Sequence, residues 1–145
     1  MEWAFWGIQG PGWLLLAYLV VTQCISAINY DLGVRMGWQE PAERATQVGA
    51  AFWWGFALGD LVVYVPLLGL GLIGHWLGTS WGALVLAAAL GMTLYWPIVC
   101  LAAAARARNA KGWSLPNERD FWIMLPAIVL WAAWGLWQLA STAAV

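Results

Sequence analysis

Apolar residues fill four long stretches of the chain, and polar residues gather between them. The apolar stretches cover residues 12–29, 48–73, 81–105 and 121–140. Because an α-helix rises 1.5 Å per residue, about 20 residues cross a bilayer core of roughly 30 Å, and each stretch is long enough. A helix of a soluble bundle carries one apolar stripe, whereas these stretches are apolar nearly all round. The pattern predicts an all-α integral membrane protein with four transmembrane helices.

Composition agrees with this prediction. Of the 145 residues, 63% are hydrophobic and 9% are charged, so a soluble chain would lack the polar surface to cover itself. We expect one membrane domain over residues 1–145, with Gly10-Pro11-Gly12 breaking the chain just before the first transmembrane helix. The segment before that helix contains no Lys or Arg, so a secretory signal is not expected.

The basic residues set the expected orientation. All six lie in the segments after the first and third predicted helices; they are Arg35, Arg44, Arg106, Arg108, Lys111 and Arg119. By the positive-inside rule, those two loops face the cytoplasm and both termini lie outside, as in a bacterial-type inner membrane. Tryptophans near the predicted helix ends fit interfacial belts, although a general aromatic preference also explains them. The net charge of −1 argues against nucleic acid as a partner.

One eight-residue stretch occurs twice. Residues 37–44 read GWQEPAER and residues 112–119 read GWSLPNER, with Gly, Trp, Pro, Glu and Arg in the same register. Each copy precedes a predicted helix, where Pro suits the first turn and Glu faces the positive end of the helix dipole, so the copies can be independent. The identities at equivalent places instead favour a duplicated helical hairpin, with parallel repeats over residues 12–73 and 81–140.

The repeated stretch also suggests contacts between the hairpins. Glu43 is placed to pair with Arg119, and Arg44 with Glu118, at about 0 to 1 kcal/mol for each exposed pair. Alternatively, both arginines bind anionic lipid headgroups, or all four charges are simply solvated.

Asp60 is the only charged residue in the second apolar stretch. It lies about 18 Å from the start of that stretch, close to the bilayer centre. A carboxylic acid there costs roughly 2.5 to 3.5 kcal/mol on insertion scales, so it normally faces protein or water. Tyr64, one turn away, can donate to it. Matching the depths of the helices predicts a polar layer of Asp60, Gln23, Tyr64, Thr93 and Trp131.

Two interpretations of this layer are open. In the functional one, Asp60 binds a proton or cation, or anchors a ligand cavity. In the structural one, Asp60 forms hydrogen bonds between helices, each worth about 0.6 kcal/mol. The motif Gly55-x-x-x-Gly59 directly before Asp60 permits close helix packing, either within the chain or between protomers.

Other candidate chemistry is sparse. Cys24 and Cys100 lie singly in the predicted helices without ligands at metal-binding spacing, so no metal site is expected. His75 can in principle bind a metal or a porphyrin, but a lone interfacial histidine more often does neither. Three prolines interrupt the predicted helices, and each can expose a backbone carbonyl. They are Pro66, Pro97 and Pro126.

No catalytic motif is present in the sequence, so no catalytic residue and no particular cofactor are predicted. The leading hypothesis is a small membrane protein that binds or transports a small solute, ion or apolar ligand around Asp60, as a homo-oligomer in the lipid bilayer. The alternative is an accessory subunit of a larger membrane complex. A lipid-modifying enzyme acting at the cytoplasmic rim, near Asp31 and Arg35, comes third.

Overall fold

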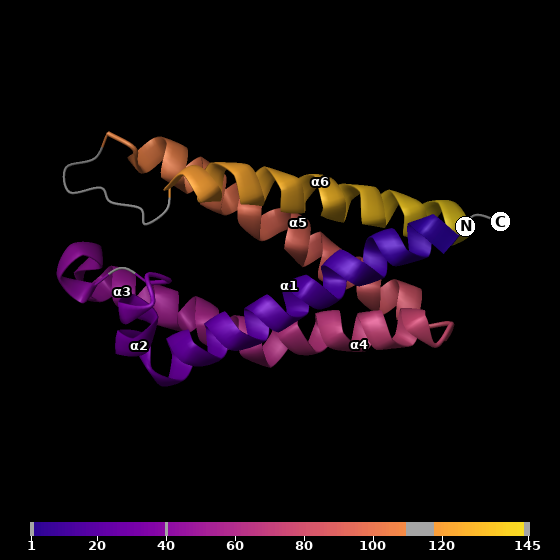
Figure 1. Cartoon of the computed structure of the whole chain (residues 1–145), viewed down its shortest axis with the longest axis horizontal. Helices are drawn as coiled ribbons and strands as arrows, with labels where there is room; N and C mark the ends of the chain where they lie inside the picture. Colours follow the sequence, from indigo (N-terminus) through magenta and orange to yellow (C-terminus); the bar gives the residue numbers. More distant parts are fainter. Residues whose placement is uncertain (1, 40, 110–117, 144–145) are drawn as a thin grey trace.

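The part of the chain that the structure describes is helical along nearly its whole length (Figure 1). The computed structural model describes residues 2–39, 41–109 and 118–143, without the side chains of residues 42, 44, 45 and 143. The elements are α1 (Glu2–Ile28), α2 (Tyr30–Arg35), α3 (Ala42–Gly59), the π-helical segment η1 (Asp60–Tyr64), α4 (Val65–Trp76), α5 (Gly82–Ala107) and α6 (Glu118–Ala143).

Four helical rods are long and apolar enough to cross a membrane. They cover Glu2–Ile28, Thr46–Trp76, Gly82–Ala107 and Glu118–Thr142, and the second consists of most of α3 together with η1 and α4. The expected all-α class and the four apolar helices are therefore confirmed.

The rods run lengthwise beside one another (Figure 1). The first residues of α1 and the last of α6 lie at one end of the bundle, while α2 and the start of α3 lie at the other. α5 packs against both α4 and α6, and α1 crosses the bundle against α3 and α4. The core is formed mainly by leucines of α1, α4 and α5, of which Leu68, Leu72 and Leu86 are fully buried.

α1 is longer than the sequence pattern predicts. It begins at Glu2 and continues through Gly10-Pro11-Gly12, so the predicted break there is wrong. Pro11 lacks the N–H that would bond to the carbonyl of Gly7 four residues earlier. The indole Nε1 of Trp131 on α6 donates to that carbonyl instead, at 2.9 Å. A contact from another helix thus replaces the hydrogen bond that proline removes.

The second rod changes its helical form at its middle. The N–H of Val65 donates to the carbonyl of Asp60, five residues earlier, as in a π-helix. Pro66 follows at once, and a proline ring clashes with the carbonyl four residues before it in a regular α-helix. The wider π turn therefore accommodates Pro66, and it places Asp60 at the point where the helix departs from regular geometry.

Glycines allow α4 and α5 to approach closely. A Cβ added to Gly71 would lie 2.7 Å from the Cα of Leu86, and one added to Gly74 would lie 2.8 Å from the Cα of Gly82. Both distances are shorter than ordinary van der Waals contact, which begins near 3.4 Å. The tight hairpin of α4 and α5 therefore requires residues without side chains at these positions.

Candidate functional site

Asp60 lies midway along the 31-residue rod Thr46–Trp76, at the start of the π segment. Its side chain is partly exposed, and it forms no hydrogen bond or ion pair with the residues that the structure describes. Within the described chain, no side chain of α5 forms a hydrogen bond or an ion pair with the carboxylate.

Tyr64 and Thr93 join η1 to α5 through a hydrogen bond. Both side chains are fully buried, and their hydroxyl oxygens are 2.5 Å apart. Thr93 Oγ1 donates its proton to the carbonyl of Ala89 at 2.8 Å, so the Tyr64 hydroxyl donates to Thr93. The single proton of Tyr64 is thus used within the core, and Asp60 does not receive it.

Two further residues of α5, absent from the predicted layer, complete the surroundings. The indole Nε1 of Trp96 is buried beside the Tyr64 hydroxyl, and it makes no hydrogen bond of good geometry among the described residues. Pro97 is buried and leaves the carbonyl of Thr93 without the N–H that a regular α-helix would supply. The irregular point of α5 thus lies beside the Tyr64–Thr93 hydrogen bond. The sequence signal for this point was TLYWP at 93–97, in which proline follows threonine at the spacing of one α-helical hydrogen bond.

Gln23 lies near the level of Asp60 along the bundle, and its depth in a membrane stays a prediction. Gln9 of α1 contacts Leu72, and Ala27 of α1 contacts Trp54, so the antiparallel register places Gln23 close to the level of Asp60. Gln23 is partly exposed and forms no hydrogen bond with the described residues. It is available to a bound group, but it does not contact Asp60 through a hydrogen bond.

Trp131 has a structural contact instead. Its only polar atom, Nε1, donates to the carbonyl of Gly7, which lies about 24 Å along α1 from Gln23. The structure thus joins Tyr64 to Thr93 and leaves Asp60 one turn before Tyr64 without a bond to either, with Gln23 near its level, whereas Trp131 uses its donor elsewhere.

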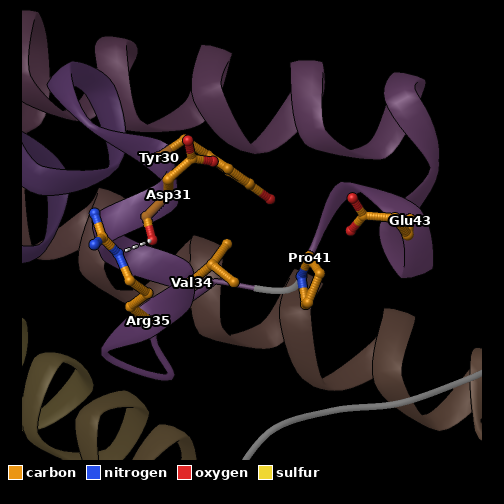
Figure 2. A pocket seen from close by; sticks show the side chains of 6 residues that line it. All are labelled: Tyr30, Asp31, Val34, Arg35, Pro41 and Glu43. Atoms are coloured by element: carbon orange, nitrogen blue, oxygen red, sulfur yellow. Dashed lines mark hydrogen bonds between the residues drawn. The ribbon is translucent and has the colours of Figure 1, made fainter.

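A second polar region lies at the opposite end of the bundle from the termini. A cavity of about 450 Å³ is lined by Tyr30, Asp31, Val34, Arg35, Pro41 and Glu43 (Figure 2). The Nε of Arg35 donates to the backbone carbonyl of Asp31 at 3.4 Å. Figure 2 shows the hydroxyl end of Tyr30 and the carboxylate of Glu43 pointing toward one another across the cavity. Two carboxylates and a guanidinium at one rim can contact a zwitterionic group.

The charges of the repeated stretch have partly different partners from those predicted. Glu43 and Glu118 lie in the first turns of α3 and α6, as expected. The Oε1 of Glu118 is 3.7 Å from the Nε of Arg108 and accepts a hydrogen bond from Trp122 at 3.1 Å. No ion pair joins Glu43 to Arg119 among the described residues. The side chain of Arg44 and residues 112–117 of the second copy lie outside the description, and lipid binding by the arginines stays a prediction.

Gly55 and Gly59 face open space in the described chain. A Cβ added at either position would have nothing within 4 Å, and both residues are exposed. Phe52 and Phe56 on the same helix are 66% and 62% exposed. The motif is therefore not packed against another helix among the described residues, and packing between protomers stays a prediction.

Comparison of this chain with known protein families, with curated proteins and with solved structures finds no match. Within the described residues, no group of three or more His, Cys, Asp or Glu side chains is placed to hold a metal ion. The function is therefore inferred from the geometry around Asp60 and from the two ends of the bundle.

Proposed function

We propose that this chain is an integral membrane protein that binds or transports a small solute or ion, best matched by a cation or a proton, at Asp60. The observation that carries the proposal is the carboxylate of Asp60, which lies midway along an apolar rod without a partner among the described residues. Intramembrane acids are costly to insert and usually face protein, water or a bound group. Asp60 therefore needs a proton, a cation or a hydrogen-bond donor from outside the described chain.

The surroundings support a site for such a group. Tyr64 does not neutralise Asp60, because its proton goes to Thr93. Pro97, one helical turn after Thr93, removes a backbone hydrogen bond from α5 near this level. A π segment is a frequent feature of functional sites in helices, and here it begins at Asp60 itself.

Transport along this route requires more than one copy of the chain. Four helices enclose little space, so we propose a homo-oligomer whose protomers meet through the face that carries Gly55 and Gly59. Small residues spaced by four permit the close approach of two membrane helices. We further propose that both termini face outward, because the basic residues gather at the opposite end of the bundle.

The test is a flux measurement on the full chain in proteoliposomes. Under an imposed potential, a trapped pH dye reports proton entry and a sodium dye reports sodium entry. Asp60→Asn is expected to abolish the flux that the wild type shows, while Asp31→Asn, a matched change at the rim, leaves it intact. Equal ion flux in the wild type, in Asp60→Asn and in empty vesicles contradicts the proposal.

One observation favours the alternative, an accessory subunit of a larger membrane complex. The face around Gly55 and Gly59 is uncovered and has the composition of a helix-packing surface. In that case Gly59→Leu prevents assembly with other membrane proteins, and Asp60→Asn changes assembly without any separable flux. Loss of flux in Asp60→Asn at unchanged assembly decides for the site.

A further inference from the structure

A third polar cluster lies at the end of the bundle where α1 begins and α6 ends, far from Asp60 along the second rod. Its centre is Gln9 of α1, which is completely buried. The Nε1 of Trp13 donates to Gln9 Oε1 at 2.9 Å, and Gln9 Nε2 donates to the carbonyl of Leu72 at 3.2 Å. The same Nε2 lies 2.9 Å from the Nδ1 of His75. All three polar functions of the Gln9 amide are therefore satisfied.

This chain of hydrogen bonds determines where His75 carries its proton. An indole N–H can only donate, so Gln9 must turn its oxygen toward Trp13 and its amide nitrogen toward His75. An amide nitrogen can only donate as well, so the Nδ1 of His75 accepts. A neutral imidazole with an accepting Nδ1 carries its proton on Nε2. His75 is thus held as a hydrogen-bond donor at Nε2.

The ring of His75 also lines a cavity. The cavity has a volume of about 230 Å³ and lies between the start of α1, the end of α4 and the last turns of α6. Its lining includes Trp3, Phe5, Ile8, His75, Gln138 and Thr142. Phe5 stacks on the imidazole with ring centroids 5.3 Å apart and planes 21° apart. Because Nδ1 is engaged with the buried Gln9, Nε2 is the polar ring atom left for this cavity.

The hydrogen-bonding groups of the cavity lining indicate which ligand chemistry the cavity can bind. The Thr142 hydroxyl donates to carbonyls of its own helix, at 2.9 Å for that of Leu139. The amide of Gln138 forms no side-chain hydrogen bond with the described residues and can donate. The donors among the lining side chains are thus His75, Gln138 and the indole of Trp3, and the walls are aromatic and aliphatic. The volume is below the roughly 300 to 1,000 Å³ of sites for drug-sized molecules, so a single ring or a short chain fits, and a porphyrin does not.

We infer that this cavity binds the carbonyl group of an apolar membrane-soluble molecule, with His75 Nε2–H donating to the carbonyl oxygen. Two sources offer this chemistry, a quinone ring and the ester carbonyl of a lipid. Further aromatic side chains pack beside the lining residue Phe5, with Phe5 and Trp76 centroids 5.7 Å apart and Trp6 and Trp76 centroids 5.4 Å apart. Such side chains favour the membrane interface, where both classes of carbonyl are found. The inference concerns binding alone and is independent of the proposed site at Asp60.

The chain contains a single histidine, so the test can observe this site directly. The imidazole nitrogens of the ¹⁵N-histidine-labelled full chain are recorded in detergent micelles by nuclear magnetic resonance. We expect a protonated Nε2 and an accepting Nδ1. Titration with decylubiquinone in one arm, and with a short-chain diacylglycerol in the other, is expected to shift the Nε2 signal in a saturable manner. The arm that saturates identifies the source of the carbonyl, and saturation in both arms means that the site accepts either.

Variants separate this site from nonspecific uptake. His75→Phe keeps a flat ring but removes the donor, and it is expected to weaken binding of the saturating compound about tenfold, the effect of one hydrogen bond. Ser141→Ala, on the same helix as Gln138 but outside the cavity lining, should bind as the wild type does. A wild-type proton on Nδ1, or no saturable shift with either compound, overturns the inference. The wild-type spectra decide the matter even where His75→Phe does not fold.

Discussion

The contact between α4 and α5 leads to a sharp prediction about stability. Gly71 lies inside α4 and is buried, and a Cβ there would meet the Cα of Leu86 at 2.7 Å and its backbone nitrogen at 2.8 Å. Ordinary contact begins near 3.4 Å, so the backbones of the two helices must separate by about 0.7 Å in Gly71→Ala. The opposing atoms are backbone atoms, so no rotation of a side chain can relieve the overlap.

The expected magnitude follows from two opposing effects. Replacing glycine by alanine inside a helix contributes about 0.5 to 1 kcal/mol of stability. Overpacking of a well-packed core costs typically 1 to 3 kcal/mol, and here it affects a backbone contact. We therefore expect Gly71→Ala to lower the free energy of unfolding by about 1 to 2 kcal/mol.

Gly91 provides the matched control. It lies inside α5, and an added Cβ would have nothing within 4 Å. Gly91→Ala should therefore keep or raise stability by up to about 1 kcal/mol. The assay is reversible unfolding of the full chain in mixed micelles, followed by tryptophan fluorescence or circular dichroism. Equal stability of the two variants would refute the close approach of α4 and α5.

Two other contacts give predictions of the same kind. Trp131→Phe leaves the carbonyl of Gly7 without a donor and is expected to lower stability by about 1 to 3 kcal/mol, measured by the same unfolding assay. In a Pro11→Ala background the restored N–H can bond to the carbonyl of Gly7. A double-mutant cycle should therefore show that Trp131→Phe lowers stability by about 1 kcal/mol less in that background than in the wild type. Additive effects of the two substitutions would contradict this prediction. Tyr64→Phe removes the buried hydrogen bond to Thr93 and should lower the free energy of unfolding by about 1 kcal/mol, measured by thermal unfolding. Tyr95 is 69% exposed, so the control Tyr95→Phe should show no measurable loss of stability.

The sequence was sufficient to predict the all-helical class, because the apolar pattern that predicts it extends over many residues. Four apolar stretches of adequate length each require helical backbone bonding if they enter lipid, and no single contact alters that conclusion. The position of Asp60 midway along its helical rod also follows from counting along one helix, as does the approximate level of Gln23. Helix-opening signals were local too, which is why Glu43 and Glu118 lie in first turns.

Tertiary structure decided what each polar group contacts. Pro11 by itself predicts a break in the helix. In the structure α1 continues, and the carbonyl of Gly7 that Pro11 leaves unbonded accepts from Trp131 of α6, which is 120 positions away from Pro11 in the sequence. The proton of Tyr64 could go to Asp60 or to Thr93, and only the packing of η1 on α5 selects Thr93. Gln9 carries no periodic signal in an apolar helix, and its role appears only when α4 brings Leu72 and His75 to it.

The two kinds of information differ for a physical reason. Burial in an apolar stretch and helix length are sums over neighbouring residues, so the order of the amino acids is enough to predict them. Hydrogen bonds are short and directional, so they depend on the crossing of helices to within a fraction of an ångström. The sequence by itself therefore determined four apolar helices, the second with one acid at its middle. The tertiary structure alone decided that this acid has no partner among the described residues, whereas the polar groups of Gln9 are fully bonded.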